Sequence, residues 1–437
     1  MRRASFVLVA IALGGVRAQA NPASVVPGTT PSGDGASHAE DAVEIYAGID
    51  YAYEADKSEI TRERVGLPGT DPNAAIPVRK DLAFKQFRHT ITPHADVGLV
   101  HGVFLSAALP IVITQARELH LDTGVDRSQS STLLEGIVPY DGYDARDPGT
   151  PPPGDLVFRG VSRHGLDQVY VGAGWAPMDQ KADDTKPTWK LGVEGRIAIG
   201  GVMKFDPANP KSNTAVGYGV HELRLWTSFD RRLPWAEPWV ELFWQVPLGA
   251  TSSSLFQDIK YGATNTMKGQ LAGASFGLEV YAVDNPLDNT RISFDVGGRA
   301  VAHFEGRDYT EMWEPFSLAG AGILQLDADP TTPGVQPLNH PGISNVENYL
   351  ETAARVALRA QLGPHVNAGL LGDFIWKTDH LISFANAGVD RDASDKIEPG
   401  TDEVNPLYNQ QIDLVGHRYR SAHNFGFAIG IQGQVLF

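Results

Sequence analysis

Apolar and polar residues alternate with a period of two along most of the chain between residues 41 and 437. In residues 189–199, for example, the apolar side chains stand at odd positions, and the charged ones between them are Lys190, Glu194 and Arg196. Because successive side chains of a strand point to opposite faces, each such segment has one apolar and one polar face. About twelve segments reach the roughly 9–11 residues that a tilted membrane strand needs. They lie near 41–56, 84–99, 102–117, 166–178, 186–200, 217–230, 237–249, 268–283, 289–305, 346–362, 364–378 and 423–437.

The connectors between these segments alternate in length. Short connectors follow every second segment, and the long connectors are 57–83, 118–165, 201–216, 250–267, 306–345 and 379–422. Short turns at one end and long loops at the other are typical of outer-membrane barrels, whose long loops face outward. A soluble sandwich or a secreted adhesin also has alternating strands, but connectors this long are implausible in a compact soluble domain. The pattern predicts an all-β protein, a transmembrane antiparallel β-barrel of about 12 strands (10–14), with short periplasmic turns and long extracellular loops.

The two ends of the chain support export to the outer membrane. Residues 1–20 combine a basic start, a short apolar run and a small-x-small ending, which predicts a signal peptide cleaved after Ala20. Residues 21–40 are rich in Pro, Gly, Ser and Thr, and are expected to form a disordered periplasmic segment ahead of a barrel at 41–437. The last segment ends in Phe437, an aromatic ending typical of strands recognised by the barrel-assembly machinery. The expected surroundings are outer-membrane lipid and lipopolysaccharide.

Composition and charge exclude several classes of protein. The chain has 437 residues, a formal net charge of −16 and no cysteine. The absence of cysteine removes disulfides, zinc–thiolate sites, iron–sulfur clusters and a lipoprotein anchor. The acidic balance argues against nucleic acid as a partner, since that binding depends on clustered Lys and Arg. We expect no cofactor and no bound metal.

If the apolar faces contact lipid, the opposite faces line a lumen that carries charges of both signs. A basic group on two neighbouring segments consists of Arg291, Arg299, Arg355 and Arg359. An acidic group on consecutive segments consists of Glu194, Glu222 and Glu241, and the remaining candidates are Arg196, Arg224, Asp295 and Glu351. Two roles stay open for these side chains: a structural lining of salt bridges, or a constriction that selects among solutes, as charged rings do in other pores.

The polar faces also carry aromatic residues, namely Tyr46, Tyr170, Trp226, Trp239, Phe243, Tyr281 and Tyr349. Aromatic residues near strand ends are typical of the girdles at the membrane interface. Their position on the face away from lipid also suits a route for apolar or aromatic solutes. The apolar stretch 312–326 inside a long connector is expected to fold into the lumen or to pack on the rim.

Two further motifs are weak indications of catalysis or of metal binding. Residues 273–277 match the G-x-S-x-G string of hydrolases, but that motif needs a strand–turn–helix setting, whereas Ser275 lies in mid-strand. We therefore expect no catalytic residue. An acidic run in the last long connector is either a solvated loop or a holder of divalent cations at the lipopolysaccharide surface; it comprises Asp390, Asp392, Asp395, Glu398, Asp402 and Glu403.

Several short stretches resemble one group of barrels. They are 107–112 (AALPIV), 165–172 (GLDQVYVG), 187–193 (PTWKLGV), 216–219 (VGYG) and 237–239 (EPW). On these motifs the chain resembles outer-membrane transporters linked to phenol and other aromatic degradation (the meta-pathway family), within the wider fatty-acid-transporter-like group of β-barrels. The resemblance implies a barrel that transports small solutes, and it carries over no binding residue.

The function expected from the sequence is therefore that of an outer-membrane channel. Small apolar or aromatic solutes would diffuse through its lumen without covalent chemistry. Two alternatives stay open. One is a structural or adhesive barrel whose lumen is closed by salt bridges, and the other is a barrel hydrolase of the lipase type.

Overall fold

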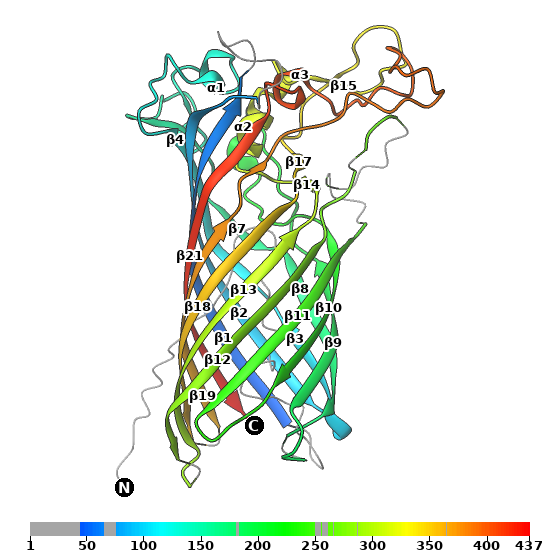
Figure 1. The fold of residues 1–437 in the computed structure, drawn as a ribbon. Coiled ribbons are helices and arrows are strands. Elements are labelled where there is room, and N and C mark those ends of the chain that lie inside the picture. Colours follow the sequence, from blue (N-terminus) through cyan, green and yellow to red (C-terminus); the bar gives the residue numbers. More distant parts are fainter. Residues whose placement is uncertain are drawn as a thin grey trace.

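The described chain forms one closed barrel with a crown of loops at one end (Figure 1). The computed structural model describes residues 44–64, 76–180, 183–249, 255, 261–264, 266–285, 287–363 and 365–437. The predicted signal peptide and the expected N-terminal segment at 21–40 lie outside the described residues. No helix in the described part of the chain is long and apolar enough to cross a membrane.

The barrel wall consists of twelve strand segments, each paired antiparallel with the next in chain order. β21 returns to pair with β1, so that Leu436 lies opposite Tyr46, and the closed wall leaves no free strand edge. The predicted transmembrane antiparallel barrel is confirmed. The wall strands are β1 (Glu44–Glu63), β2 (Val78–Gly98), β3 with β4 (Val103–Ala108 and Ile111–Leu121), β7 with β8 (Arg163–Leu166 and Gln168–Met178), β9 (Thr188–Ala198), β10 (His221–Asp230), β11 (Ala236–Leu248), β12 (Leu271–Asn285), β13 (Thr290–His303), β18 (Tyr349–Leu362), β19 (Val366–Lys377) and β21 (Tyr419–Leu436).

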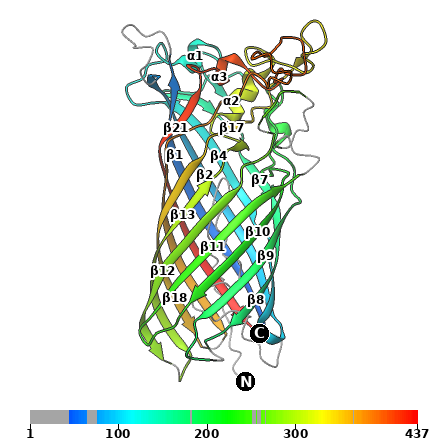
Figure 2. The same cartoon turned by 45° about the vertical axis from the view of Figure 1, so that its right-hand side comes forward.

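The two ends of the barrel differ, as the connector lengths predict. At the end that we call the turn end, short connectors such as η2 (Val100–Gly102) join the strands, and the C-terminus lies there (Figure 1). The long connectors gather at the opposite end, which we call the loop end (Figure 2). The strands cross the wall at a steep tilt in both views, as closure of a barrel requires.

The outer face of the wall is apolar. Its exposed side chains belong to Ile, Leu, Val, Phe and Trp, and include Ile45, Leu105, Val171, Trp175, Val193, Leu225, Leu242, Phe276, Phe294, Val296, Leu358, Phe374 and Ile429. The residues between them on the same strands are charged, small or aromatic and lie buried inside, among them Glu194, Arg196, Arg224 and Asp295. Exposed apolar side chains in a continuous belt are stable only against lipid.

Three strands extend beyond the predicted segments at the loop end. β1 continues to Glu63 and β2 begins at Val78, whereas the alternation of apolar residues indicated 41–56 and 84–99. β21 begins at Tyr419, inside a predicted loop. The backbone pairing continues there, with Glu63 opposite Val78. The reason is that both faces of these extensions contact loops or water, so no alternation marks them.

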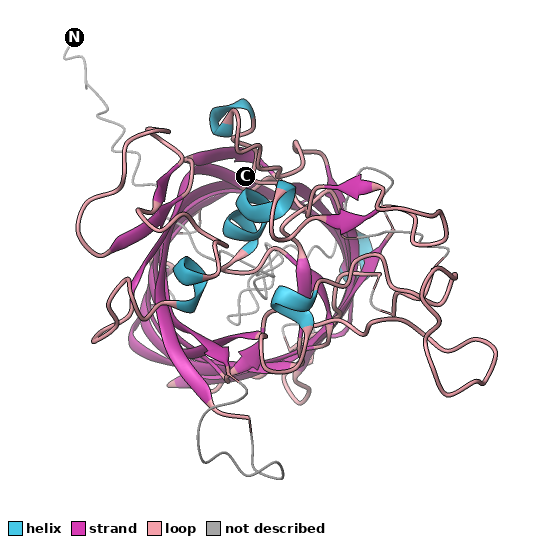
Figure 3. Cartoon of the chain, turned by 90° about the horizontal axis from the view of Figure 1, so that it is seen from above, coloured by secondary structure: helices cyan, strands magenta, loops and turns pink. Residues whose placement is uncertain are grey.

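The loops at the loop end carry the remaining elements. We use the name cap for these elements together with their connectors 122–162, 304–348 and 378–418. Seen along the barrel axis, loops and short helices lie across part of the ring of strands (Figure 3). These elements are α1 (Ser131–Leu134), β5 (Tyr143–Asp144), β6 (Leu156–Arg159), β14 (Gly306–Asp308), α2 (Trp313–Leu318), η4 (Ala319–Ala321), β15 (Leu326–Asp327), β16 (Pro337–Leu338), β17 (Ser344–Val346), β20 (His380–Leu381) and α3 (Gln410–Asp413); η3 (Pro210–Ser212) lies in the loop between β9 and β10.

Candidate functional site

The predicted arginines on β13 and β18 line the inner wall, and each pairs with a different carboxylate. Arg355 binds Asp373 of the next strand through two hydrogen bonds of 2.8 and 2.9 Å. The other three pairs are Arg299 with Glu351 at 2.6 Å, Arg359 with Asp295 at 2.8 Å, and Arg291 with Asp284 at 3.4 Å. The structure therefore places the four guanidinium groups in separate ion pairs along the wall.

The predicted acidic residues, on other strands of the inner wall, are likewise paired. Glu194 accepts from Arg196 at 2.6 Å, and Glu222 accepts from Lys268 at 2.8 Å. These groups are buried, so each charge loses most of its hydration and depends on its partner. Lys268 was not among the predicted lumen residues, although it is the first residue of the predicted segment 268–283; in the structure it lies just before β12, which begins at Leu271. The lumen lining is thus rich in charge and nearly balanced in sign.

An apolar row crosses this charged lining. It follows the hydrogen-bond register from strand to strand, through Phe104, Gly174, Gly192, Trp226, Phe243, Gly273 and Val301. Phe104 is the second residue of β3 at the turn end, whereas Val301 lies near the loop end of β13. The four large side chains of the row belong to one buried hydrophobic cluster with Tyr46 and Leu271. Because the strands tilt, the row climbs along the lumen from one end towards the other.

The glycines of the row make room for its rings. A Cβ atom on Gly174 would lie 2.2 Å from the Phe104 ring, and one on Gly192 would lie 2.6 Å from the Trp226 ring. Gly273 stands in the same relation to Phe243, at 2.5 Å. The aromatic rings therefore lie flat on the wall over the glycines of the neighbouring strand, and do not project across the lumen.

One ion pair crosses the row. Arg224 lies on the loop side of the row and Glu241 on its turn side, and their side chains meet at 2.5 Å. The guanidinium carbon of Arg224 is 4.5 Å from the centroid of the Phe243 ring, a cation–π contact. Arg224 thus covers the row at Phe243.

Four other predicted aromatics are also on the inner side, each held by a polar neighbour. Tyr170 packs under Arg196, with 4.6 Å between the guanidinium carbon and the ring centroid. The Trp239 indole donates to Asp295 at 3.1 Å, and the Tyr281 hydroxyl donates to Glu237 at 2.5 Å. Tyr349 is stacked between His303 and His380, with ring centroids 4.1 and 4.0 Å apart. These contacts link the aromatic side chains to neighbouring strands of the wall.

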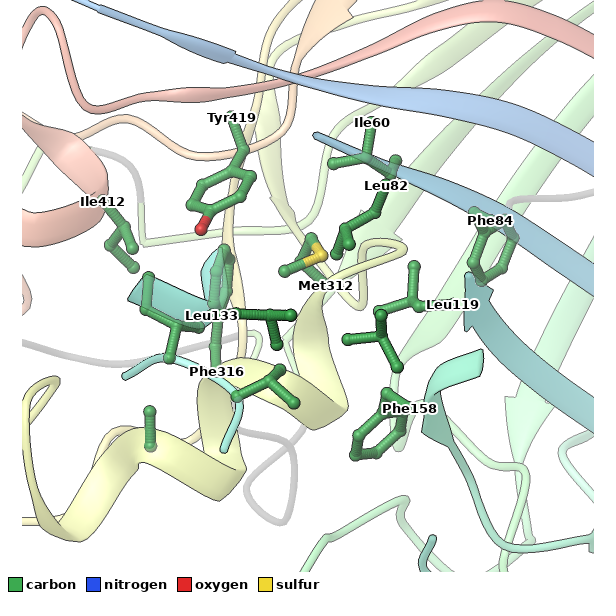
Figure 4. Packing of buried hydrophobic residues seen from close by; sticks show 14 of the residues in the cluster. Ile60, Leu82, Phe84, Leu119, Leu133, Phe158, Met312, Phe316, Ile412 and Tyr419 are labelled. Carbon is green, nitrogen blue, oxygen red and sulfur yellow. The ribbon is translucent and has the colours of Figure 1, made fainter. Parts of the chain in front are cut away.

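The cap has a hydrophobic core of its own, which holds the long connector 304–348 against the wall (Figure 4). Met312 and Phe316 of this connector pack among side chains from the upper ends of the wall strands and from the loops around α1 and α3. The partners in this core include Ile60, Leu82, Phe84, Leu119, Leu133, Phe158, Ile412 and Tyr419. The apolar stretch 312–326 therefore packs at the loop end as a fixed part of the mouth of the barrel.

A buried ion pair anchors α2 in this position. Arg163 of β7 contacts Glu314 of α2 at 2.8 Å, and both side chains are almost wholly buried. The Arg163 guanidinium also lies 4.7 Å from the Trp313 ring and donates to the carbonyl of Ala215. Sequence reasoning missed this pair, since the two residues are far apart in the chain and lie outside the alternating pattern.

The two minor motifs differ in what the structure brings together. Ser275 of β12 lies opposite Glu241 and Arg299 on the neighbouring strands, and no histidine of the described residues hydrogen-bonds to it. In the acidic loop, one carboxylate oxygen each of Asp390, Asp392 and Glu403 lie within 4.8 Å of one another, which is a spacing that a cation accepts. These carboxylates also accept backbone N–H groups of their own loop.

Comparison with known proteins finds only distant likenesses. No family model and no curated protein matches the chain. Among solved structures, it matches an outer membrane channel from Pseudomonas putida F1 with 8% identity, 90% of this chain and 95% of that chain covered, and a TM-score of 0.35. A Pseudomonas aeruginosa FadL homologue matches with 9% identity, 94% and 95% coverage and a TM-score of 0.34.

The outer membrane protease OmpT of Escherichia coli also matches, with 9% identity, 90% of this chain and 97% of that chain covered, and a TM-score of 0.28. Because the identities and TM-scores are this low, the likenesses do not decide what this chain does. Its function has to be argued from its own lumen.

Proposed function

We propose that the protein is an outer-membrane channel through which small apolar or aromatic solutes diffuse, with the loop end facing outward. The observation that carries this proposal is the apolar row from Phe104 to Val301, which climbs the inner wall of a closed barrel. An apolar solute that moves along the row keeps part of its surface out of water, at about 25 cal/mol for each Å² covered.

The charges beside the row suit the same function. Because they are paired within the wall, as in Arg299–Glu351 and Glu194–Arg196, the lumen offers no strong field of one sign. A lumen of this kind neither traps a simple ion nor requires one. No covalent step and no cofactor enters this mechanism.

Uptake into proteoliposomes tests the proposal. The full chain is reconstituted, and the entry of labelled phenol is compared with the entry of labelled arabinose. We expect phenol to enter several times faster than through protein-free vesicles, and arabinose to gain much less. Equal gains for the two solutes would contradict a route along an apolar surface, and no gain for either would contradict a channel.

A pair of variants tests the row itself. Trp226→Gln places a polar side chain in the row, and Leu225→Ala changes the next residue, whose side chain faces outward. We expect Trp226→Gln to lower phenol entry severalfold and Leu225→Ala to leave it unchanged. The reverse result, or equal losses, would remove the row as the route.

A further inference from the structure

A hollow in the cap lies where three loops meet. It measures about 310 Å³ including its opening to solvent. Arg307, His340 and Asn345 line it from connector 304–348, and Asp413 lines it from connector 378–418. Ala263 of the loop before β12 completes the wall, and Ile343, Phe384 and Leu407 give the hollow an apolar side. None of the residues that line the hollow belongs to the apolar row of the lumen.

Arg307 is the unusual residue of this hollow. Its side chain is 3% exposed, and neither Nε nor Nη2 of its guanidinium has a hydrogen-bond partner in the described structure. The buried arginine of the same cap that anchors α2, Arg163, has a carboxylate at 2.8 Å. A buried guanidinium without such a partner loses its hydration, and no carboxylate replaces that hydration. The Arg307 guanidinium therefore has free hydrogen-bond donors and a positive charge that an anion can bind.

The geometry of the two unpartnered guanidinium nitrogens fits a carboxylate. Nε and Nη2 of one guanidinium point the same way and bind the two oxygens of a carboxylate side by side. The Asn345 amide, opposite Arg307 in the β14–β17 pair, has an unpartnered oxygen, and the same amide turned over presents its NH2 group. One guanidinium charge balances a monoanion, and the apolar side chains of Ile343, Phe384 and Leu407 lie on another side of the hollow.

The two titratable neighbours of Arg307 carry little charge below neutral pH. His340 accepts the Gly342 N–H on Nδ1, so the ring is neutral with its proton on Nε2. Burial, with a smaller contribution from Arg307, lowers the pKa of His340 to about 3. Burial raises the pKa of Asp413 to about 7, against the pull of the Asn409 N–H and of Arg307. Below neutral pH, Asp413 is therefore largely uncharged.

We propose that this hollow is a binding site for the carboxylate of a small monocarboxylic acid, held by Arg307 and Asn345 between connectors 304–348 and 378–418 of the cap. The acid joins two loops that otherwise meet there across an unpaired charge. The site does not depend on the proposed transport, since it lies in the cap and binds a ligand without moving it.

Calorimetric titration of the full chain in detergent with sodium acetate at constant ionic strength tests the site. We expect one acetate per chain, and about tenfold tighter binding at pH 6 than at pH 8, because ionised Asp413 competes for Arg307. Arg307→Gln should abolish binding and Arg307→Lys should weaken it. Arg391→Gln, which changes an exposed arginine already paired with Asp402, should leave it unchanged.

Three results would overturn the proposal. They are no heat of binding with the unchanged protein, equal binding by Arg307→Gln, and competition by chloride at the same concentration as acetate, which would indicate a simple halide site. The folded state of each variant is checked by its heat-dependent migration on a denaturing gel. The Asp413→Asn variant should bind acetate with little dependence on pH, and a retained tenfold change would contradict the role of that carboxyl.

Discussion

At the scale of single residues, the inner wall depends on where glycine stands. Gly192 lies under the Trp226 ring, and an added Cβ would also come within 2.9 Å of the Ala173 carbonyl oxygen. The Trp226 ring and the backbone cannot both move away from the added Cβ without a cost in free energy, because the strands of the wall are hydrogen-bonded to each other. Replacing Gly192 by Ala is therefore an overpacking change, which costs about 1–3 kcal/mol in well-packed sites.

We expect Gly192→Ala to lower the free energy of unfolding by about that amount and to change the fluorescence of Trp226, as measured by urea unfolding in detergent. Gly195→Ala on the same strand is the matched control. Its nearest neighbour would be the Val171 carbonyl oxygen at 3.8 Å, so no clash arises. A similar loss in both variants would mean that glycine acts through backbone freedom, not as a seat for the ring.

A second residue-scale prediction concerns pH in the cap. The pKa of Asp413 is raised to about 7, so its contribution to stability is complete at low pH and is lost as pH rises towards 7. The pKa of His340 is lowered to about 3, so its contribution is complete above the ordinary histidine pKa and is lost as pH falls. The changes of stability with pH that the two groups cause have opposite signs between about pH 4 and 6.5 and largely cancel.

The stability of the cap should therefore be nearly flat over this interval. Asp413→Asn should leave only the pH dependence of stability that His340 causes, so that the cap opens more readily as pH falls. His340→Gln should do the opposite, with easier opening as pH rises. Hydrogen exchange of the amides around α3, followed from pH 4 to 6.5, measures both. Parallel slopes in the two variants would show that neither group titrates as its burial indicates.

At the scale of elements, α2 shows how a short helix keeps its place. It has only six residues and no side-chain cap, so its own hydrogen bonds cannot hold it. Its position comes from the packing of Phe316 in the cap and from Glu314 on Arg163. Removing one partner of a buried ion pair leaves a charge that can no longer be balanced.

Glu314→Gln should therefore destabilise connector 304–348 by about 3 kcal/mol or more, with faster hydrogen exchange across α2 and an unchanged barrel wall. Asp402→Asn, which breaks an exposed pair with Arg391, should cost less than about 1 kcal/mol. Exchange that rises equally in the wall and in α2 would contradict a local anchor.

The strands could be predicted from the sequence because lipid on one side and the lumen on the other impose a period of two. β9 and β13 match the predicted segments to within two residues at each end. The cap could not be predicted, since its contacts, such as Arg163 with Glu314, join residues far apart in the chain. No local pattern encodes such pairs.

The same limit applies to the site at the scale of the whole molecule. The alternation identified which residues face inward, among them Trp226 and Phe243. It did not give the register between strands, and a row exists only once the register is fixed. The role of Gly174, Gly192 and Gly273 could therefore not be predicted, although these glycines lie under the aromatic rings of the row and leave space for them. The pairing of Arg355 with Asp373 was equally hidden.

The last prediction concerns the pair of Arg224 with Glu241, which crosses the apolar row and covers the Phe243 ring. Changing one partner alone would leave the other charge buried, so both are changed together, as Arg224→Ala with Glu241→Gln. The double variant uncovers the Phe243 ring while the backbone pairing of β10 with β11 stays intact. Phenol should then enter proteoliposomes severalfold faster.

The control removes a similar pair that lies away from the row, as Arg355→Ala with Asp373→Asn. This variant also loses one buried ion pair and widens the lumen, but it uncovers none of the rings in the row. It should change phenol entry much less than the first double variant. If the two variants speed phenol entry equally, width alone governs passage, and the row has no special part in it. If only the first does so, solutes follow the apolar surface, and Arg224 sets the barrier along it.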